Sequence, residues 1–187
     1  MSKAGFDWLT IDLEHSSITI KEVEELLRII QLNKIKGFVR LSDNNSTLIK
    51  RIMDAGSDGI IVPMVETKKD ALDAIKSIKY PPIGIRGMGL SRAQGYGNNF
   101  KKYIEWVDKF PTIILQIESI KGVENLNEIL SVPNISGIFI GPYDLSASLG
   151  VPGEFDNPKF KRSINKIENI CFKKNMKLGF HIVEPNV

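Results

Sequence analysis

The chain has 187 residues, of which 42% are hydrophobic and 25% charged, and its formal net charge is +3. This length fits a single domain over residues 1–187, and the composition excludes the disordered and fibrous classes. The small charge, with basic and acidic residues interspersed, argues against a nucleic-acid binder. The single cysteine, Cys171, excludes an internal disulfide and lies on the apolar face of a predicted helix, so we expect it in the core.

The first ten residues contain one lysine that is not followed by an apolar core, so the sequence predicts no signal peptide. No apolar run approaches the length of a transmembrane helix. We therefore expect a cytoplasmic protein without a membrane partner.

Short runs of β-branched and aromatic residues alternate with helical patterns along the chain. The short runs predict strands at 6–12, 37–41, 59–65, 112–118, 137–142 and 177–183. Apolar residues at three- and four-residue spacing predict helices at 20–30, 48–53, 71–78, 123–130 and 160–171. Gly37 and Gly56 follow the first two helical patterns as plausible stop signals.

The alternation predicts βαβ crossovers and a parallel α/β sheet. A doubly wound nucleotide fold would be favoured by a Gly-x-Gly-x-x-Gly turn, but Gly84, Gly87 and Gly89 have the wrong spacing and follow two prolines. The alternative is a TIM-type (β/α)₈ barrel, which predicts functional residues at the carboxyl ends of several strands.

Polar residues do follow the apolar runs of four predicted strands. Any one carboxylate after a strand is more often a helix cap or a solvated turn than a ligand, and Arg40 alone could be half of a structural ion pair. Because the carboxyl ends of parallel strands meet at one edge, the coincidence across four strands favours a functional rim and the barrel. The polar residues are Asp12, Glu14, His15, Arg40, Gln116, Glu118 and Asp144, the last of which follows the turn at Gly141 and Pro142.

Glu118 and Asp144 offer oxygen ligands, which suit Mg²⁺ or Mn²⁺ better than a structural zinc. Two carboxylates leave coordination positions for a 2-oxo acid, whose enolate such a Lewis acid would stabilise. Arg40 would add positive charge beside the keto oxygen, and His15 could act as acid or base. Asp54 is a weaker candidate for orienting that imidazole. No predicted strand ends in lysine, so a Schiff-base aldolase is not indicated.

With these residues in place, the sequence resembles the HpcH/HpaI aldolase family. The matching stretches are "FDWLTIDLEHSS", "VRLSDN", "DAGSDGIIVPMV", "YPPIGIRGMG", "LQIES" and "GIFIGPYDLSASLG", and they cover almost the whole chain in family order. The resemblance implies a class II aldolase that cleaves 4-hydroxy-2-oxo acids to pyruvate and an aldehyde with a divalent metal, Mg²⁺ or Mn²⁺, with Co²⁺ as a further option. It also implies a barrel of the phosphoenolpyruvate/pyruvate superfamily and a homo-oligomer, a hexamer or trimer.

Site roles follow from the same resemblance. His15 takes the place of the catalytic histidine, Asp54 that of its carboxylate partner and Arg40 that of the arginine at the keto oxygen. Glu118 and Asp144 fall on the metal ligands. The pyruvate-binding surface is expected at Arg40, Gln116, Gly141, Pro142, Tyr143 and Asp144. Tyr143 departs from the small residue common at its position, which leaves the aldehyde open.

The resemblance also implies elements on both sides of this chain, so we expect a barrel truncated at both ends, with about six βα units. Two alternatives stay open. One is a citramalyl- or malyl-CoA lyase, for which no phosphate-binding element is seen, and the other is an inactive remnant or structural subunit.

The glycine-rich stretch from Tyr80 to Asn99 is predicted to be a functional loop. Its Arg86 and Arg92 are expected either to reach an anionic substrate or a neighbouring subunit, or to be solvated at the surface. His181 ends the last predicted strand and points to either the core or the rim.

Overall fold

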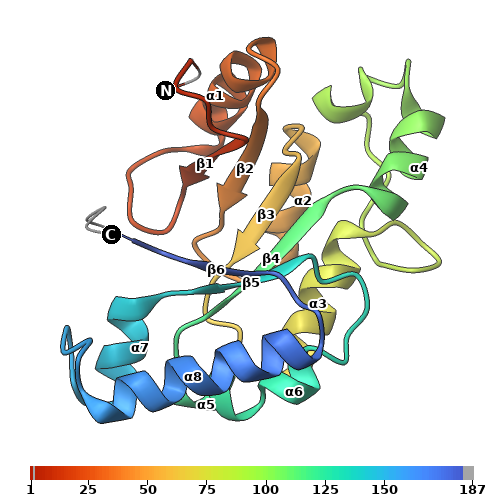
Figure 1. Cartoon of the computed structure of the whole chain (residues 1–187). Helices are drawn as coiled ribbons and strands as arrows, with labels where there is room; N and C mark the ends of the chain where they lie inside the picture. The colour runs from red at the N-terminus through yellow and green to blue at the C-terminus, as the bar shows by residue number, and fades with distance from the viewer. Residues whose placement is uncertain (2, 183–187) are drawn as a thin grey trace. The chain divides into compact units, whose positions relative to one another are not determined.

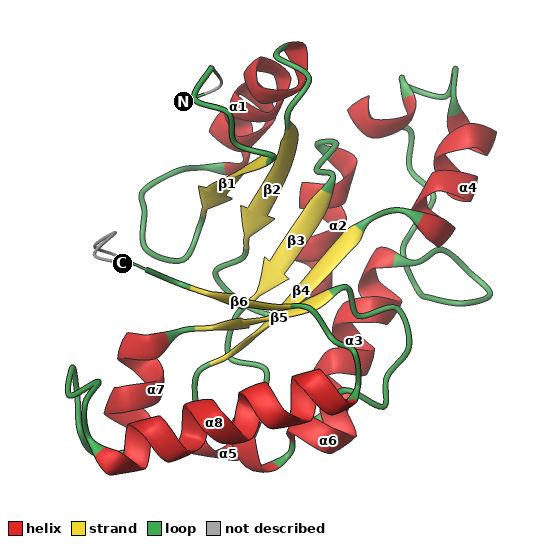
Figure 2. Ribbon diagram, viewed as in Figure 1, coloured by secondary structure: helices red, strands yellow, loops and turns green. Residues whose placement is uncertain are grey.

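The structure is a computed structural model that describes residue 1 and residues 3–182. The chain forms two compact units, which we call the first unit (1–62 and 73–113) and the second unit (63–72 and 114–187). Strands and helices alternate as predicted (Figures 1 and 2). Val183, the last residue of the final predicted strand, lies outside the described residues.

The first unit contains three parallel strands, each of which continues into a helix or loop at its carboxyl end. They are β1 (Trp8–Asp12), β2 (Lys36–Arg40) and β3 (Gly59–Val62), paired in that order. All four β3 residues are buried, as expected for a parallel strand covered on both faces. In the pairing register Asp12 lies opposite Arg40, so the carboxyl ends of β1 and β2 are level.

Two helices connect these strands. They are α1 (Ile20–Leu32) and α2 (Ser46–Asp54). The predicted apolar face of α1 buries Val23, Leu27 and Ile30. Thr19 and Glu22 form a capping box, which satisfies amide groups that the first helical turn leaves without partners.

The two predicted stop glycines behave differently. Gly56 follows α2 with a φ of +93°, a conformation that favours glycine, so this prediction is confirmed. The prediction for Gly37 is wrong, because α1 ends at Leu32 and Gly37 lies inside β2. A Cβ at Gly37 would lie 2.6 Å from Leu27 Cδ2, so the residue allows α1 to pack closely on the strand.

The helices and the loop between β3 and β4 come next in the chain. They are α3 (Lys68–Ile78), the 3₁₀ turn η1 (Arg92–Gln94) and α4 (Phe100–Lys109). The stretch from Tyr80 to Asn99 is irregular as predicted, apart from η1. Helix α4, which buries Tyr103 and Val107, was not predicted from the sequence.

The second unit contains the carboxyl-terminal part of β4 and two further strands, all parallel. The strands are β4 (Thr112–Ile117), β5 (Gly137–Ile140) and β6 (Leu178–Phe180). The helices are α5 (Ile120–Glu124), α6 (Leu126–Ile129), α7 (Pro142–Ser148) and α8 (Pro158–Lys173). The helix predicted at 123–130 is thus two short helices that meet at Asn125, and α7 was not predicted.

Cys171 lies on the buried face of α8 with 2% exposure, which confirms the predicted core position. Burial raises the pKa of its thiol to about 11, so the side chain stays protonated and unreactive at neutral pH. Within residues 1 and 3–182, no helix has the length and apolar character needed to cross a bilayer.

Candidate functional site

In the first unit, Arg40 is the last residue of β2, and two carboxylates from the carboxyl end of β1 hold its side chain. Its Nε and Nη2 donate to Asp12 at 2.8 and 2.6 Å, and its Nη1 lies 3.0 Å from Glu14 Oε2. The arginine side chain is 13% exposed. The two-point contact fixes the plane of the guanidinium and presents a positive charge at this rim.

Asp12 also accepts a hydrogen bond from the Glu14 N–H at 2.9 Å. Burial of the Asp12 carboxyl opposes ionisation, but the hydrogen bonds from Arg40 and from the backbone of Glu14 outweigh it and lower the pKa of Asp12 below its ordinary value. A lowered carboxyl pKa stabilises the folded state above the unfolded pKa, and this stabilisation is lost as the pH falls through the folded pKa.

We therefore predict that Asp12→Asn is less stable than the wild type at pH 7, and that the difference shrinks as the pH falls below about 4. Urea unfolding at a series of pH values measures it. Asp7→Asn, at an exposed aspartate before β1, is the matched control and should follow the wild-type profile. A pH-independent difference for Asp12→Asn would contradict the assigned role of this carboxylate.

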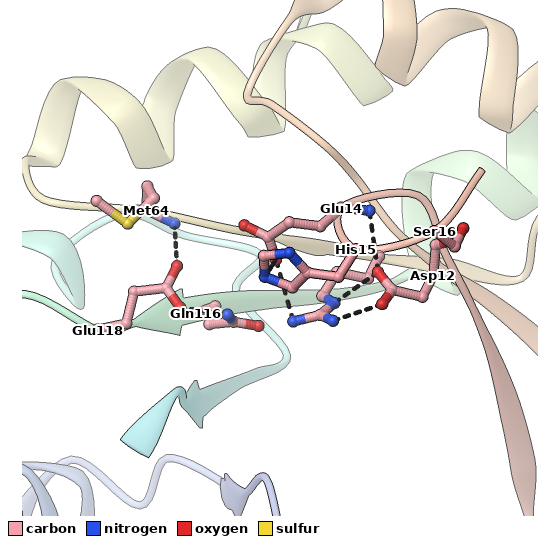
Figure 3. Close-up of polar contacts among 8 residues, drawn as sticks. Asp12, Glu14, His15, Ser16, Met64, Gln116 and Glu118 are labelled. Atoms are coloured by element: carbon pink, nitrogen blue, oxygen red, sulfur yellow. Dashed lines mark hydrogen bonds and ion pairs between the residues drawn. The ribbon is translucent and has the colours of Figure 1, made fainter. Parts of the chain in front are cut away.

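His15 lies at the same rim, three residues after β1 ends. Its side chain is 65% exposed, and its Nε2 lies 4.0 Å from Glu14 Oε2 (Figure 3). An exposed imidazole beside a carboxylate is accessible to a substrate, which suits a group that transfers protons.

In the second unit, the carboxyl end of β4 delivers a buried carboxylate. Glu118 is 2% exposed, and its Oε1 accepts a hydrogen bond from the Met64 N–H at 2.7 Å (Figure 3). The Gln116 side-chain amide donates to the other oxygen, Oε2. Glu118 is therefore fixed in place by a backbone donor and a side-chain donor.

The residues after β5 lie against this carboxylate. A Cβ at Gly141 would be 2.5 Å from Glu118 Oε2, so the absence of a side chain lets the β5–α7 turn approach it. Asp144 is exposed in the first turn of α7, and Pro142 is the first residue of that helix. Tyr143 is 52% exposed, and its ring meets Phe155 edge to face at 5.1 Å.

These oxygen donors fit a hard divalent cation. Within residues 1 and 3–182, no three His, Cys, Asp or Glu side chains gather into a ready metal site. The amide oxygen of Gln116 is buried and accepts no hydrogen bond from the described part of the chain. Such an atom is costly unless a cation, a water molecule or a ligand meets it, and it lies beside the Glu118 carboxylate.

Asp54 and His15 lie at opposite edges of the first unit's strands. His15 follows the carboxyl end of β1, whereas α2 runs back and ends at Asp54, five residues before β3 starts. Asp58, in the same turn, accepts a hydrogen bond from the N–H of Gly37 near the amino end of β2. The predicted contact between His15 and Asp54 is therefore not formed within one chain.

Asp54 instead contacts Arg86, with 2.6 Å between Oδ1 and Nη2. Arg92 donates to the backbone oxygen of Ala55 at 2.6 Å and to Gln31 Oε1 at 2.8 Å. Solvation at the surface, one of the two positions predicted for Arg86, is wrong, because its side chain is completely buried.

His181 is exposed and stacks on Phe139 with 6.2 Å between ring centres, so it does not belong to the core.

The Met64 N–H, which contacts Glu118, was not predicted from the sequence. Met64 has a φ of +51°, which is rare for a residue other than glycine and often marks a functional position. Residue identity does not determine the direction of a backbone amide, so the only available signal was the position of Pro63-Met64 directly after a buried strand.

A sequence model of the HpcH/HpaI aldolase/citrate lyase family matches residues 1–183. The chain belongs to the HpcH/HpaI aldolase/citrate lyase family. This confirms the predicted family. The two curated relatives described next are named aldolases, which are carbon–carbon lyases. The chain is 36% identical to 2-keto-3-deoxy-L-rhamnonate aldolase of Klebsiella pneumoniae subsp. pneumoniae over 97% of its own length and 68% of that protein's.

A second relative is 2-dehydro-3,6-dideoxy-6-sulfogluconate aldolase of Pseudomonas putida, 37% identical over 94% of this chain and 69% of that one. A crystal structure of an HpcH/HpaI aldolase/citrate lyase family protein from Burkholderia cenocepacia J2315 matches with a TM-score of 0.91 and 31% identity. The match covers 96% of this chain and 72% of the Burkholderia protein's chain. The parallel α/β fold of this HpcH/HpaI chain is thus the fold of its family.

Proposed function

We propose that this HpcH/HpaI chain is a divalent-metal-dependent class II aldolase that cleaves 4-hydroxy-2-oxo acids to pyruvate and an aldehyde. The observation that carries the proposal is the buried Glu118 carboxylate beside Gly141, at the turn into the helix that bears Asp144. Two curated relatives that are named aldolases support it.

In this proposal Glu118 and Asp144 hold Mg²⁺, Mn²⁺ or Co²⁺, and the fixed Glu118 oxygens limit where a cation binds. A bound divalent cation supplies Lewis-acid stabilisation for the negative charge that develops when the bond between C3 and C4 breaks. Gln116 and the turn formed by Gly141, Pro142, Tyr143 and Asp144 bind the pyruvate part of the substrate. The buried Gln116 oxygen accepts no hydrogen bond from the described residues, which supports this placement.

Arg40 and His15 act on the same substrate. The guanidinium of Arg40, held by Asp12 and Glu14, contributes positive charge beside the keto oxygen. His15, directly or through water, removes the proton of the C4 hydroxyl. The C4–O bond becomes the aldehyde carbonyl, the electron pair of the C3–C4 bond passes to the enolate, and protonation of C3 gives pyruvate.

The direct test is aldol formation and cleavage. Purified protein with Mg²⁺ or Mn²⁺, pyruvate and short aldehydes should give a 4-hydroxy-2-oxo acid, detected by NMR. The expected product should disappear in EDTA and return when the metal is restored. Cleavage of citramalyl-CoA with no aldol product from pyruvate would favour the thioester lyase instead.

Asp54 reaches His15 only if it comes from a second copy, because the two residues lie at opposite edges within one chain. We propose a homo-oligomer in which each site combines His15 of one copy with Asp54 of another. Co-expression of His15→Ala and Asp54→Ala chains, each inactive alone, should restore about one quarter of wild-type activity, since each site draws the two residues independently from equal pools. No restoration in mixed oligomers would contradict the shared site.

Gly141→Ala tests the approach of the β5–α7 turn to Glu118. The new methyl group meets the carboxylate at 2.5 Å and must displace it. We expect kcat/KM to fall on the order of tenfold or more, because small displacements of a site cost much of the rate. Gly89→Ala is the matched control, since a Cβ there meets nothing within 4 Å. Equal activity of the two variants would argue against Glu118 as a site residue.

Residues 1–187 would form one catalytic domain with about six of the eight βα units of a phosphoenolpyruvate/pyruvate-superfamily barrel. The family match across residues 1–183, which include both units, supports this assignment.

A further inference from the structure

Arg86 is a buried cation in the long loop between α3 and α4. Its side chain has no exposed surface. Its guanidinium contacts Asp54 Oδ1 through Nη2 at 2.6 Å and the Tyr103 hydroxyl through Nη1 and Nη2, each at 3.2 Å. The same group stacks on the rings of Tyr80 and Tyr103, at 4.7 and 5.3 Å from their centres. Two aromatic rings and a hydroxyl thus fix the direction in which Arg86 points.

The backbone on both sides of Arg86 is fixed as well. The Arg86 N–H donates to the Lys79 oxygen at 3.0 Å, and the Ile85 N–H donates to the Lys76 oxygen at 2.8 Å. A Cβ at Gly84 would lie 2.1 Å from the Lys79 oxygen, so the loop lies directly on the carboxyl end of α3. The position of the guanidinium is therefore determined independently of Asp54.

The Asp54 carboxylate is held on one side only. Its side chain is 24% exposed, and Oδ1 is the oxygen that contacts Arg86. Oδ2 accepts no hydrogen bond from the part of the chain that the structure describes. Asp54 is thus oriented by a fixed cation while it keeps an accessible acceptor, which is what a carboxylate that orients an imidazole requires.

Attachment of the loop does not by itself explain a charged pair here. Arg92 attaches the same loop to Ala55 and Gln31. A buried ion pair is a poor source of net stability compared with apolar packing of similar volume. The contact between Arg86 and Asp54 therefore points to a role for the carboxylate itself.

We infer that Arg86 is a positioning residue that orients Asp54 toward His15 of a second copy. This inference rests on the proposed function, and it assigns to the loop a role in catalysis that involves no contact with substrate. Arg86 must then act in the chain that supplies Asp54, and not in the chain that supplies His15.

Complementation between chains tests this directly. Arg86→Met should lower kcat on the order of 10²-fold with KM changed less than about twofold, because the geometry of a proton-transfer pair is lost and substrate binding is not. Co-expressed with His15→Ala, it should restore activity; co-expressed with Asp54→Ala, it should not. Arg86→Lys should recover part of kcat, because an ammonium group still reaches one carboxylate oxygen. Calorimetric Mn²⁺ binding should match the wild type.

If Arg86→Met causes only a structural defect, the variant chain should complement neither His15→Ala nor Asp54→Ala, and that result would overturn the inference. Restored activity with Asp54→Ala but not with His15→Ala would overturn it as well. Tyr103→Phe keeps the ion pair but removes the hydroxyl from the guanidinium. If Arg86→Met does not fold, Tyr103→Phe replaces it in the test. This variant should lose less kcat than Arg86→Met, and it should likewise restore activity with His15→Ala and not with Asp54→Ala. A wild type without aldol product refutes the proposed function, whereas an active wild type with the wrong complementation refutes only the role of Arg86.

Discussion

Glu118→Gln is expected to lower kcat/KM for cleavage of a 4-hydroxy-2-oxo acid on the order of 10²- to 10³-fold, since a cation at this site contributes several kcal/mol of charge stabilisation. Glutamine keeps the shape of the side chain and an oxygen that accepts from the Met64 N–H. It loses the negative charge that would hold the cation. The fold should therefore survive, and the loss should appear in catalysis and metal affinity.

Three measurements on Glu118→Gln separate these effects: steady-state kinetics, calorimetric Mn²⁺ binding and the free energy of unfolding. Glu128→Gln, an exposed glutamate of α6 in the same unit, is the matched control and should behave as the wild type in all three. Glu118→Gln with full activity and unchanged Mn²⁺ affinity would remove the metal assignment.

The position of Glu118 was predictable from the sequence because two patterns agree there. A continuously apolar run predicts a strand buried on both faces, and polar residues directly after such a run fall at the carboxyl edge. The structure places β4 at Thr112–Ile117, and Glu118 is the next residue. Arg40 was found by the same logic at the end of β2. The locations of both residues follow from where a strand ends, and the short-range pattern of apolar residues predicts strand ends well.

The surroundings of Asp54 depend on contacts that no short-range pattern reports. Asp54 and Arg86 are 32 residues apart, and the arginine lies in a loop whose glycines and prolines predict irregularity but not a path. The position of Asp54 opposite to His15 follows from the return of α2 to the amino end of β3. That step could have been taken from the predicted order of elements, because a helix after a parallel strand always returns to the other edge.

Arg86→Met is expected to lower the free energy of unfolding by about 2 to 4 kcal/mol, since removal of one partner of a buried ion pair leaves the other charge without compensation. The expected loss of stability is smaller than for a fully buried pair, because the Asp54 side chain is 24% exposed and gains hydration. Asp54→Asn in the same chain should recover part of the loss, because the uncompensated charge is then absent. Guanidinium chloride unfolding of the two single variants and the double variant measures the coupling.

Arg28→Met is the matched control for this prediction. Arg28 pairs with Glu24 one turn away on α1, but its side chain is 52% exposed. An exposed pair of this kind contributes roughly 0.3 to 0.5 kcal/mol, so the control should unfold almost as the wild type does. Equal effects of the two substitutions would mean that the contact of Arg86 with Asp54 is as weak as a solvated one. A carboxylate held so weakly would not keep a fixed direction, and the proposed orientation of His15 by Asp54 would lose its structural basis.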